Sequence, residues 1–120
     1  MSEASLYDRL GGGDKIREIV ADIWANHISN PLIQNRYAKS DGEHVQQVVW
    51  EFFCAGTGGP QAYSGDDMLT AHSGMNISDQ EFNAVTDDVL KALDKNNVGK
   101  QERDEVLVIL YSMKGEIAHV

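Results

Sequence analysis

The stretch from position 64 to 78, SGDDMLTAHSGMNIS, places His72 among small and apolar residues, with a glycine two positions later. An imidazole in this setting can pack in a core, exchange protons near neutral pH or bind a metal ion. No other histidine, cysteine or carboxylate stands at a metal-ligand spacing from it, which argues against a zinc site of three or four protein ligands. The chain also shows no sharp-turn nucleophile motif, because Cys54 follows Phe52 and Phe53 within a helical pattern.

Haem iron is a metal centre that needs only one protein imidazole. The porphyrin supplies most of the coordination, and apolar side chains supply most of the pocket. A lone histidine opposite a phenylalanine-rich helical segment meets this requirement. We therefore consider haem ligation for His72 beside a purely structural role.

The other three histidines have simpler interpretations. His119 lies one residue from the C-terminus, and we expect it to be solvated. His27 lies on the apolar stripe of a predicted helix, where we expect a partly buried imidazole with a local hydrogen bond. His44 stands just before the apolar face of its helix and borders whatever that face covers.

The segment 14–28 predicts an amphipathic helix. Its apolar side chains recur at the i, i+3, i+4, i+7 spacing of one helical face: Ile16, Ile19, Val20, Ile23, Trp24 and Ile28. A GGG sequence at 11–13 separates it from a short helix near residues 6–10, and Asn30-Pro31 ends it.

A second helical pattern runs through Val45, Val48, Val49 and the two phenylalanines, after KSDGE, where Ser40 or Asp41 is the expected N-cap. It stops at GTGGP, residues 56–60, where three glycines and a proline predict a break and a loop. The loop lasts until DMLTAH. His72 is therefore expected on a short element flanked by loops.

Two more helices complete the pattern. Ser78 and Glu81 form the spacing of a capping box before a helix that contains Phe82, Val85, Val89 and Leu93. The last helix is expected from about residue 101 to 117, burying Val106, Ile109, Leu110, Met113 and Ile117. No segment favours a strand, so the sequence predicts an all-α fold in a single domain, residues 1–120.

Composition narrows the class of protein. The 120 residues are 42% hydrophobic, enough for one core without disulfides, and the single cysteine has no internal partner. A net charge of −9 argues against nucleic acid or an anionic membrane surface as a partner. The N-terminus lacks a secretory pattern, and no window approaches the roughly 18 apolar residues of a membrane span. We expect a cytoplasmic protein with no membrane contact.

Several motifs recur together in an order typical of one family. They are SLYDRLGGGDKI at the start, the Phe-Phe pair before GTGGP, the tyrosine in AYSG, and M-x-x-A-H followed by G-x-x-I. With the final amphipathic helix they span nearly the whole chain. In these features the sequence resembles the truncated haemoglobins of group I.

The resemblance implies a truncated-globin two-over-two helical sandwich around haem b, the protoporphyrin IX iron cofactor, with His72 as the proximal iron ligand. It also implies six ring contacts: Met68, Ile77 and Phe82 on the proximal side, Phe52 and Phe53 from the helix above, and Tyr37 as a wedge. Arg36 and Lys39, beside that tyrosine, are candidates to neutralise the haem propionates.

The distal side departs from the family's common pattern. Many members carry a tyrosine in the second helix and often a glutamine opposite it. Here alignment through the glycine motifs gives Trp24 at the tyrosine position, with Val45 and Val49 facing the ligand. The indole N–H can donate one hydrogen bond and accept none. At helical spacing Gln46 and Gln47 are expected to point sideways or outward.

The function that the resemblance implies is reversible binding of O2, NO and CO, with oxygen binding and transport as the simplest role. Group I relatives are also associated with the oxidation of nitric oxide to nitrate. That dioxygenase activity requires an electron donor, and no flavin or nicotinamide motif occurs in the chain. A separate reductase is therefore expected, with the globin a monomer or weak dimer.

Two other classes of function remain open. One is a redox haem protein, either a bis-histidyl electron carrier or a peroxidase-like enzyme, in which His44 swings in as the distal ligand or acid-base group. The other is a small helical module without a cofactor. The resting spectrum separates them, since a six-coordinate ferrous form supports histidine on both faces and a colourless protein supports the module.

Overall fold

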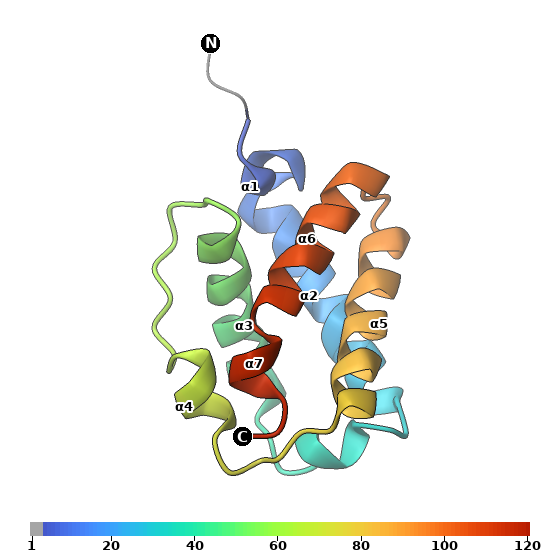
Figure 1. Cartoon of the computed structure of the whole chain (residues 1–120). Helices are drawn as coiled ribbons and strands as arrows, with labels where there is room; N and C mark the ends of the chain where they lie inside the picture. The colour runs from blue at the N-terminus through green and yellow to red at the C-terminus, as the bar shows by residue number, and fades with distance from the viewer. Residues whose placement is uncertain (1–3) are drawn as a thin grey trace.

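The computed structural model describes residues 4–120, which form seven α-helices and one 3-10 helix (Figure 1). The helices are α1 (Leu6–Arg9), α2 (Gly12–Ser29), η1 (Gln34–Tyr37), α3 (Gly42–Gly56), α4 (Met68–His72), α5 (Asp79–Lys95), α6 (Lys100–Ser112) and α7 (Lys114–Ile117). Over these residues there is no strand, only one isolated bridge between Ile77 and Ala118. None of the described helices has the length and hydropathy needed to cross a membrane.

Four long helices form the two-over-two arrangement that the family resemblance implies. Helix α2 packs against both α3 and α5, and α5 packs in turn against α6. The largest fully buried side chains of the core are those of Ile16, Ile19, Cys54 and Leu93, from α2, α3 and α5. Each large apolar side chain buried in this way stabilises the fold by roughly 1.5–3 kcal/mol.

The two glycine motifs meet at Tyr7 of α1. Its hydroxyl accepts hydrogen bonds from the backbone N–H of Gly13, at 2.8 Å, and from Nε2 of Gln61, at 3.0 Å. Its backbone N–H donates to the carbonyl of Thr57 at 2.8 Å. One tyrosine thus ties the start of α2 to the loop that follows α3.

The helix starts follow the predicted capping chemistry. Ser78 accepts a hydrogen bond from the backbone N–H of Glu81, and the glutamate side chain accepts one from the backbone N–H of Ser78, which completes the capping box. Of the two candidates before α3, Asp41 is the N-cap, because its carboxylate accepts from the backbone N–H groups at 43 and 44. Such a cap stabilises a helix by about 1 kcal/mol.

The C-terminal helix differs from the prediction. Instead of one helix to residue 117, the chain breaks at Met113, and the short α7 packs against α4. Of the five side chains expected to be buried there, only Val106 is buried, and the other four are half-buried; all five line a cavity. The bend at Met113 therefore brings the chain end to the histidine-bearing helix (Figure 1).

Candidate functional site

A cavity of about 310 Å³ lies between the helices and is partly open to solvent. Helices α2 to α7 and η1 all contribute to its wall. Most of its lining is aliphatic or aromatic: Val20, Ile23, Trp24, Tyr37, Val45, Val48, Val49, Phe52, Phe53, Tyr63, Met68, Ala71, Val85, Val89, Val106, Ile109, Leu110, Met113 and Ile117. Four side chains of the lining carry nitrogen: the indole of Trp24, the imidazoles of His27 and His72, and the amide of Gln46.

His72 ends α4 at the cavity wall. Asp67 is the N-cap of this helix, and its carboxylate accepts a hydrogen bond of 2.7 Å from the backbone N–H of Thr70. Gly74, at φ +85°, turns the chain away just after the histidine, in a backbone conformation that favours glycine. The imidazole is therefore held on a short helix between a side-chain cap and a turn.

The tautomer of His72 follows from its hydrogen bond. Nδ1 lies 2.8 Å from the carbonyl oxygen of Met68, which can only accept, so Nδ1 carries the proton. Nε2 then has a free lone pair, and no hydrogen bond to it is formed within residues 4–120. A metal-binding histidine typically donates its other N–H in this way, which fixes the ring and raises the basicity of the ligating nitrogen.

Aromatic rings form part of the cavity wall. The rings of Phe52 and Tyr63 meet edge to face with centroids 5.1 Å apart. The hydroxyl of Tyr63 donates to the backbone carbonyl of Asp66 at 2.5 Å, which holds the loop before α4. Phe53 and Met68 line the same cavity. Five of the seven predicted cofactor contacts, counting His72 and Tyr37, therefore border one apolar space.

Trp24 stands on the α2 side of the cavity, against the start of α3. Its ring meets that of Tyr37 edge to face at 5.5 Å and 80°. A Cβ atom at Gly42 would lie 2.9 Å from Cζ2 of the indole, so the glycine permits this close approach. Within the described residues the indole N–H makes no hydrogen bond, and Val45 and Val49 line the wall beside it. The donor remains available.

His27 is more buried than expected, and its hydrogen bond is not local. Its Nδ1 lies 2.8 Å from Oδ2 of Asp88 on α5, 61 positions away. The ring also stacks on Tyr37, with centroids 5.3 Å apart and planes 10° apart. Burial lowers the pKa of His27 from its usual 6.5, and the Asp88 carboxylate opposes this effect only in part.

Gln46 lines the cavity, contrary to the expectation that it points sideways or outward. It precedes Val49 by three residues and Phe53 by seven, which is the spacing of one helical face. That spacing was the signal that could have identified it. Gln47 does behave as expected: it is exposed and hydrogen-bonds to Arg17 and Glu51.

Three predicted site residues lie away from the cavity lining. His44 is exposed in the first turn of α3, because the apolar face of the helix begins one residue later. Ile77 is buried beside the bridge to Ala118, where its carbonyl accepts from the backbone N–H of His119 at 2.9 Å. Phe82 is buried against Tyr111, with ring centroids 5.4 Å apart, so it packs α5 on α6.

The candidate cations near Tyr37 differ in their partners. Arg36 forms a two-pronged ion pair with Glu81, with Nη2 donating at 2.9 Å. This pair, together with the hydrogen bond from the backbone N–H of Ser78, lowers the pKa of Glu81 from 4.5 to about 2. Lys39 is exposed and forms no ion pair within the part of the chain described. Lys39 is thus the more available of the two for a carboxylate ligand.

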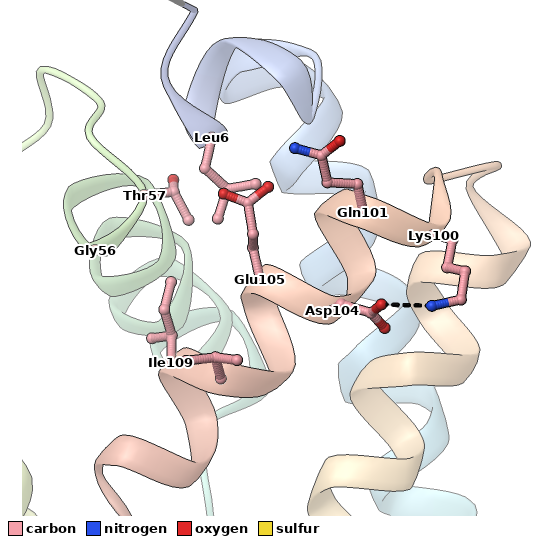
Figure 2. Close-up of a pocket in the computed structure, with 9 residues that line it drawn as sticks. Leu6, Gly56, Thr57, Lys100, Gln101, Asp104, Glu105 and Ile109 are labelled. Carbon is pink, nitrogen blue, oxygen red and sulfur yellow. Dashed lines mark hydrogen bonds and ion pairs between the residues drawn. The ribbon is translucent and has the colours of Figure 1, made fainter.

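A second hollow, of about 830 Å³, lies on the surface between α1, the end of α3 and α6 (Figure 2). Its wall combines Leu6 and Ile109 with the polar side chains of Gln101 and Glu105, and an ion pair of 2.7 Å joins Lys100 to Asp104. It has no histidine and no aromatic ring. The chemistry expected for His72 therefore belongs to the inner cavity.

The inner cavity fits a haem group by the chemistry of its lining. It offers one imidazole with a free Nε2, aromatic and aliphatic walls suited to a porphyrin, and a partly open side for charged propionates. Among residues 4–120 no group of three or more His, Cys, Asp or Glu side chains converges on a shared metal position. A single-imidazole site is the metal chemistry that the lining can provide.

Comparison with known proteins identifies the family. The family model of the bacterial-like globins matches residues 5–119, and the chain belongs to this family. It is similar to the group 1 truncated hemoglobin of Mycolicibacterium paratuberculosis, at 27% identity over 96% of this chain and 85% of the relative. It is also 24% identical to the group 1 truncated hemoglobin of Nostoc commune, over 95% and 97%.

Solved structures show the same fold. The Fe(III) form of the truncated hemoglobin from Tetrahymena pyriformis superposes with a TM-score of 0.94 at 20% identity, covering 98% of this chain and all of the other. The family match and the group 1 relatives confirm the resemblance to the truncated haemoglobins of group I, and the superposition confirms the two-over-two fold. The chain is a haem globin, and small gaseous molecules are its ligands.

Proposed function

We propose that this globin holds haem b through Nε2 of His72 and retains O2, NO or CO in the apolar space beside Trp24, Val45 and Val49. One observation carries the proposal: the hydrogen bond from Nδ1 of His72 to the Met68 carbonyl leaves Nε2 free at the cavity wall. When bound, haem supplies the iron centre for diatomic gases and for the oxidation of nitric oxide by O2.

The chain's own residues shape that chemistry in three ways. The Met68 carbonyl accepts the hydrogen bond from Nδ1 and so orients the imidazole. The aliphatic and aromatic lining excludes water from the gas, which strengthens any hydrogen bond formed inside. The indole N–H of Trp24 and the amide of Gln46 are the two neutral donors beside the valines, in place of the tyrosine and glutamine common in the family.

Substitution of His72 tests the haem site. His72→Ala is expected to abolish stable haem retention, and added imidazole is expected to restore part of the Soret absorbance by filling the vacated space. His44→Ala is the matched control, because His44 is exposed and outside the lining. Normal haem retention with an unchanged ferrous spectrum in His72→Ala would contradict the assignment.

Nitric oxide dioxygenation is the enzymatic role that we propose, with ferrous iron restored by a separate reductase. The net charge of −9 favours a reductase with a basic docking surface, so electron delivery should slow as salt rises. Nitrate formation from NO and O2 in stopped-flow mixing tests the activity. Reduction by a protein partner that does not change between low and high salt would remove the electrostatic part of this proposal.

We do not propose the bis-histidyl alternative with His44. The side chain of His44 is exposed at the start of α3 and does not line the cavity. A five-coordinate ferrous spectrum is therefore expected. A six-coordinate low-spin ferrous spectrum that is lost in His44→Ala would instead support ligation of the iron by His44.

A further inference from the structure

The helix that carries His72 has an apolar outer side that no other part of the described chain, residues 4–120, covers. The side chains of Leu69 and Met75 are 51% and 37% exposed, and Ala71 between them is exposed as well. Two backbone hydrogen bonds hold the segment in one turn: the Leu69 carbonyl accepts from the N–H of Ser73 at 2.8 Å, and the His72 carbonyl accepts from that of Met75 at 3.1 Å. Helix α4 lies at one margin of the molecule with α7 packed against it (Figure 1).

Negative charge is concentrated in the part of the chain that contains this helix. Residues 40–90 hold nine of the 19 acidic residues and none of the ten Lys and Arg residues. The rest of the chain has ten acidic and ten basic residues, so this segment carries the whole net charge of −9. It comprises α3, α4 and the greater part of α5. The side of the fold that bears His72 is therefore acidic, whereas the remainder is balanced.

Several exposed carboxylates stand beside α4. Asp66 and Asp67 directly precede the helix, and Glu116 lies on α7; none of the three forms an ion pair within the described residues. The nearby cation on α7, Lys114, is already paired with Asp79 at 3.2 Å. Exposed apolar side chains surrounded by polar residues are typical of interaction sites. The α4 face consists of Leu69, Met75, Asp66, Asp67 and Glu116.

The charge of the α4 face restricts what can cover it. Two copies of the chain would bring like charges together there, which disfavours a homodimer through this face. Anionic membrane surfaces and nucleic acids are repelled for the same reason. A protein with a basic rim around an apolar centre is complementary to it, and an apolar centre within a polar rim is the common anatomy of protein interfaces.

We propose that the α4 face is the docking site of the one-electron donor protein that reduces this globin, and that the donor carries Lys or Arg side chains around an apolar surface beside its own redox centre. Leu69 and Met75 are each three positions from His72, so docking there brings the donor to the side of the cavity that bears the proximal imidazole. One electron leaves the donor and converts ferric to ferrous iron, and no bond forms or breaks. The inference rests on the haem site and the reductase proposed above.

Electron exchange with ferric cytochrome c tests the docking site, because this basic protein exposes its haem edge within a ring of lysines. Ferrous globin is mixed with it anaerobically in a stopped-flow instrument, and one electron passes from the globin iron to the cytochrome iron. Leu69→Gln should lower the second-order rate constant several-fold. Leu32→Gln is the matched control, because Leu32 is 52% exposed but lies between α2 and η1, outside residues 40–90. Hexaammineruthenium(III), a small cation without an apolar surface, should oxidise both variants at the wild-type rate.

A second pair of variants tests the charge. Asp66→Asn and Asp14→Asn each remove one exposed carboxylate that forms no ion pair within residues 4–120, the first beside α4 and the second at the start of α2. At low salt Asp66→Asn should react more slowly with cytochrome c than Asp14→Asn, because the charge that it removes lies in the interface. The difference should shrink as salt rises. Equal rate constants at low salt would show that only the net charge matters, and would overturn the docking site.

NMR measures binding without electron transfer. Isotope-labelled globin in its CO-bound ferrous form is titrated with ferric cytochrome c, and the backbone amide signals of residues 66–76 are expected to shift. The signals of residues 30–33, around the control position, should stay in place. Shifts confined to residues outside α4, its flanks and α7 would overturn the proposal.

The remaining outcomes separate the docking site from the haem site. Equal cytochrome c kinetics for Leu69→Gln and Leu32→Gln, with normal oxidation by hexaammineruthenium(III), would overturn only the docking site. Met75→Gln replaces Leu69→Gln in this comparison if the latter loses haem. Self-association of wild type that Leu69→Gln abolishes would assign the α4 face to a second copy of the chain, and would also overturn the proposal. A protein without a Soret band would overturn the haem site itself.

Discussion

Tyr7 and Gly59 are in contact: a Cβ atom placed on the glycine would lie 2.5 Å from Cδ1 and 2.6 Å from Cε1 of the tyrosine ring. These distances are shorter than nonbonded carbon atoms tolerate. The tyrosine cannot move away freely, because its hydroxyl and its backbone N–H are hydrogen-bonded to Gly13 and Thr57. Position 59, in the loop after α3, therefore has no room for a side chain and requires glycine.

Gly59→Ala is expected to destabilise the fold by about 1–3 kcal/mol, the usual cost of overpacking a rigid contact. Denaturant unfolding of the haem-loaded protein measures the change in the free energy of unfolding. Gly56→Ala is the matched control, because nothing lies within 4 Å of a Cβ at that position. Equal stability of the two variants would show that the ring of Tyr7 moves aside at little cost.

Trp24 is expected to slow the release of O2 through its indole N–H. Trp24→Phe keeps an aromatic wall and removes the donor, so the O2 off-rate should rise several-fold, corresponding to about 1 kcal/mol for one hydrogen bond. Trp24→Tyr restores a hydroxyl donor and should slow release. Flash photolysis with O2 and CO measures both, and CO should change less because its outer atom carries less negative charge. Equal O2 off-rates for wild type and Trp24→Phe would show that the indole acts only through its volume.

Gly42 controls the position of that indole. Gly42→Ala would bring a methyl carbon to 2.9 Å from Cζ2 and 3.1 Å from Nε1 of Trp24, so the ring must shift. If the N–H is correctly aimed in wild type, the O2 off-rate should rise toward the Trp24→Phe value. In a Trp24→Phe background the same substitution should have a much smaller kinetic effect, and an undiminished effect there would contradict the coupling.

The pH dependence of stability should contain a contribution from His27. Its pKa is lowered in the folded state from 6.5, mainly by burial, so the unfolded chain binds the proton more readily. Stability is therefore expected to fall as pH drops below about 6.5 toward the folded pKa. Thermal unfolding of wild type and His27→Gln between neutral and mildly acidic pH measures this loss. His27→Gln should be less stable than wild type at neutral pH, but its stability should fall less steeply as the pH drops below about 6.5.

The ion pair of Arg36 and Glu81 should contribute at lower pH. The arginine, followed by the backbone N–H of Ser78, lowers the pKa of Glu81 from 4.5 to about 2, so this stabilisation is present above pH 4.5 and is lost as pH falls toward 2. Both side chains are partly exposed, which limits the effect to about 1 kcal/mol or less. NMR titration of Arg36→Gln should show the pKa of Glu81 returning toward 4.5. Lys39→Gln is the control and should leave that pKa unchanged.

The sequence by itself determined the features that depend on neighbours within one or two helical turns. The apolar stripes predicted the long helices, the Ser78 and Glu81 pair predicted the start of α5, and the glycine motifs predicted the breaks around α2 and α3. The same holds for His72, whose hydrogen-bond partner Met68 lies four residues earlier on the same short helix. Local spacing is enough in each case because the interaction closes within the element.

Only the tertiary structure decided which distant side chains share the cavity. His27 and Asp88 are 61 positions apart, and their hydrogen bond depends on how α2 crosses α5. The rotation of α3 turns Gln46 inward and leaves His44 exposed, although only one residue separates the two in the sequence. Periodicity identifies an apolar face of a helix, but the helix packed against that face sets which residues at its edge become part of the cavity wall and which remain in solvent.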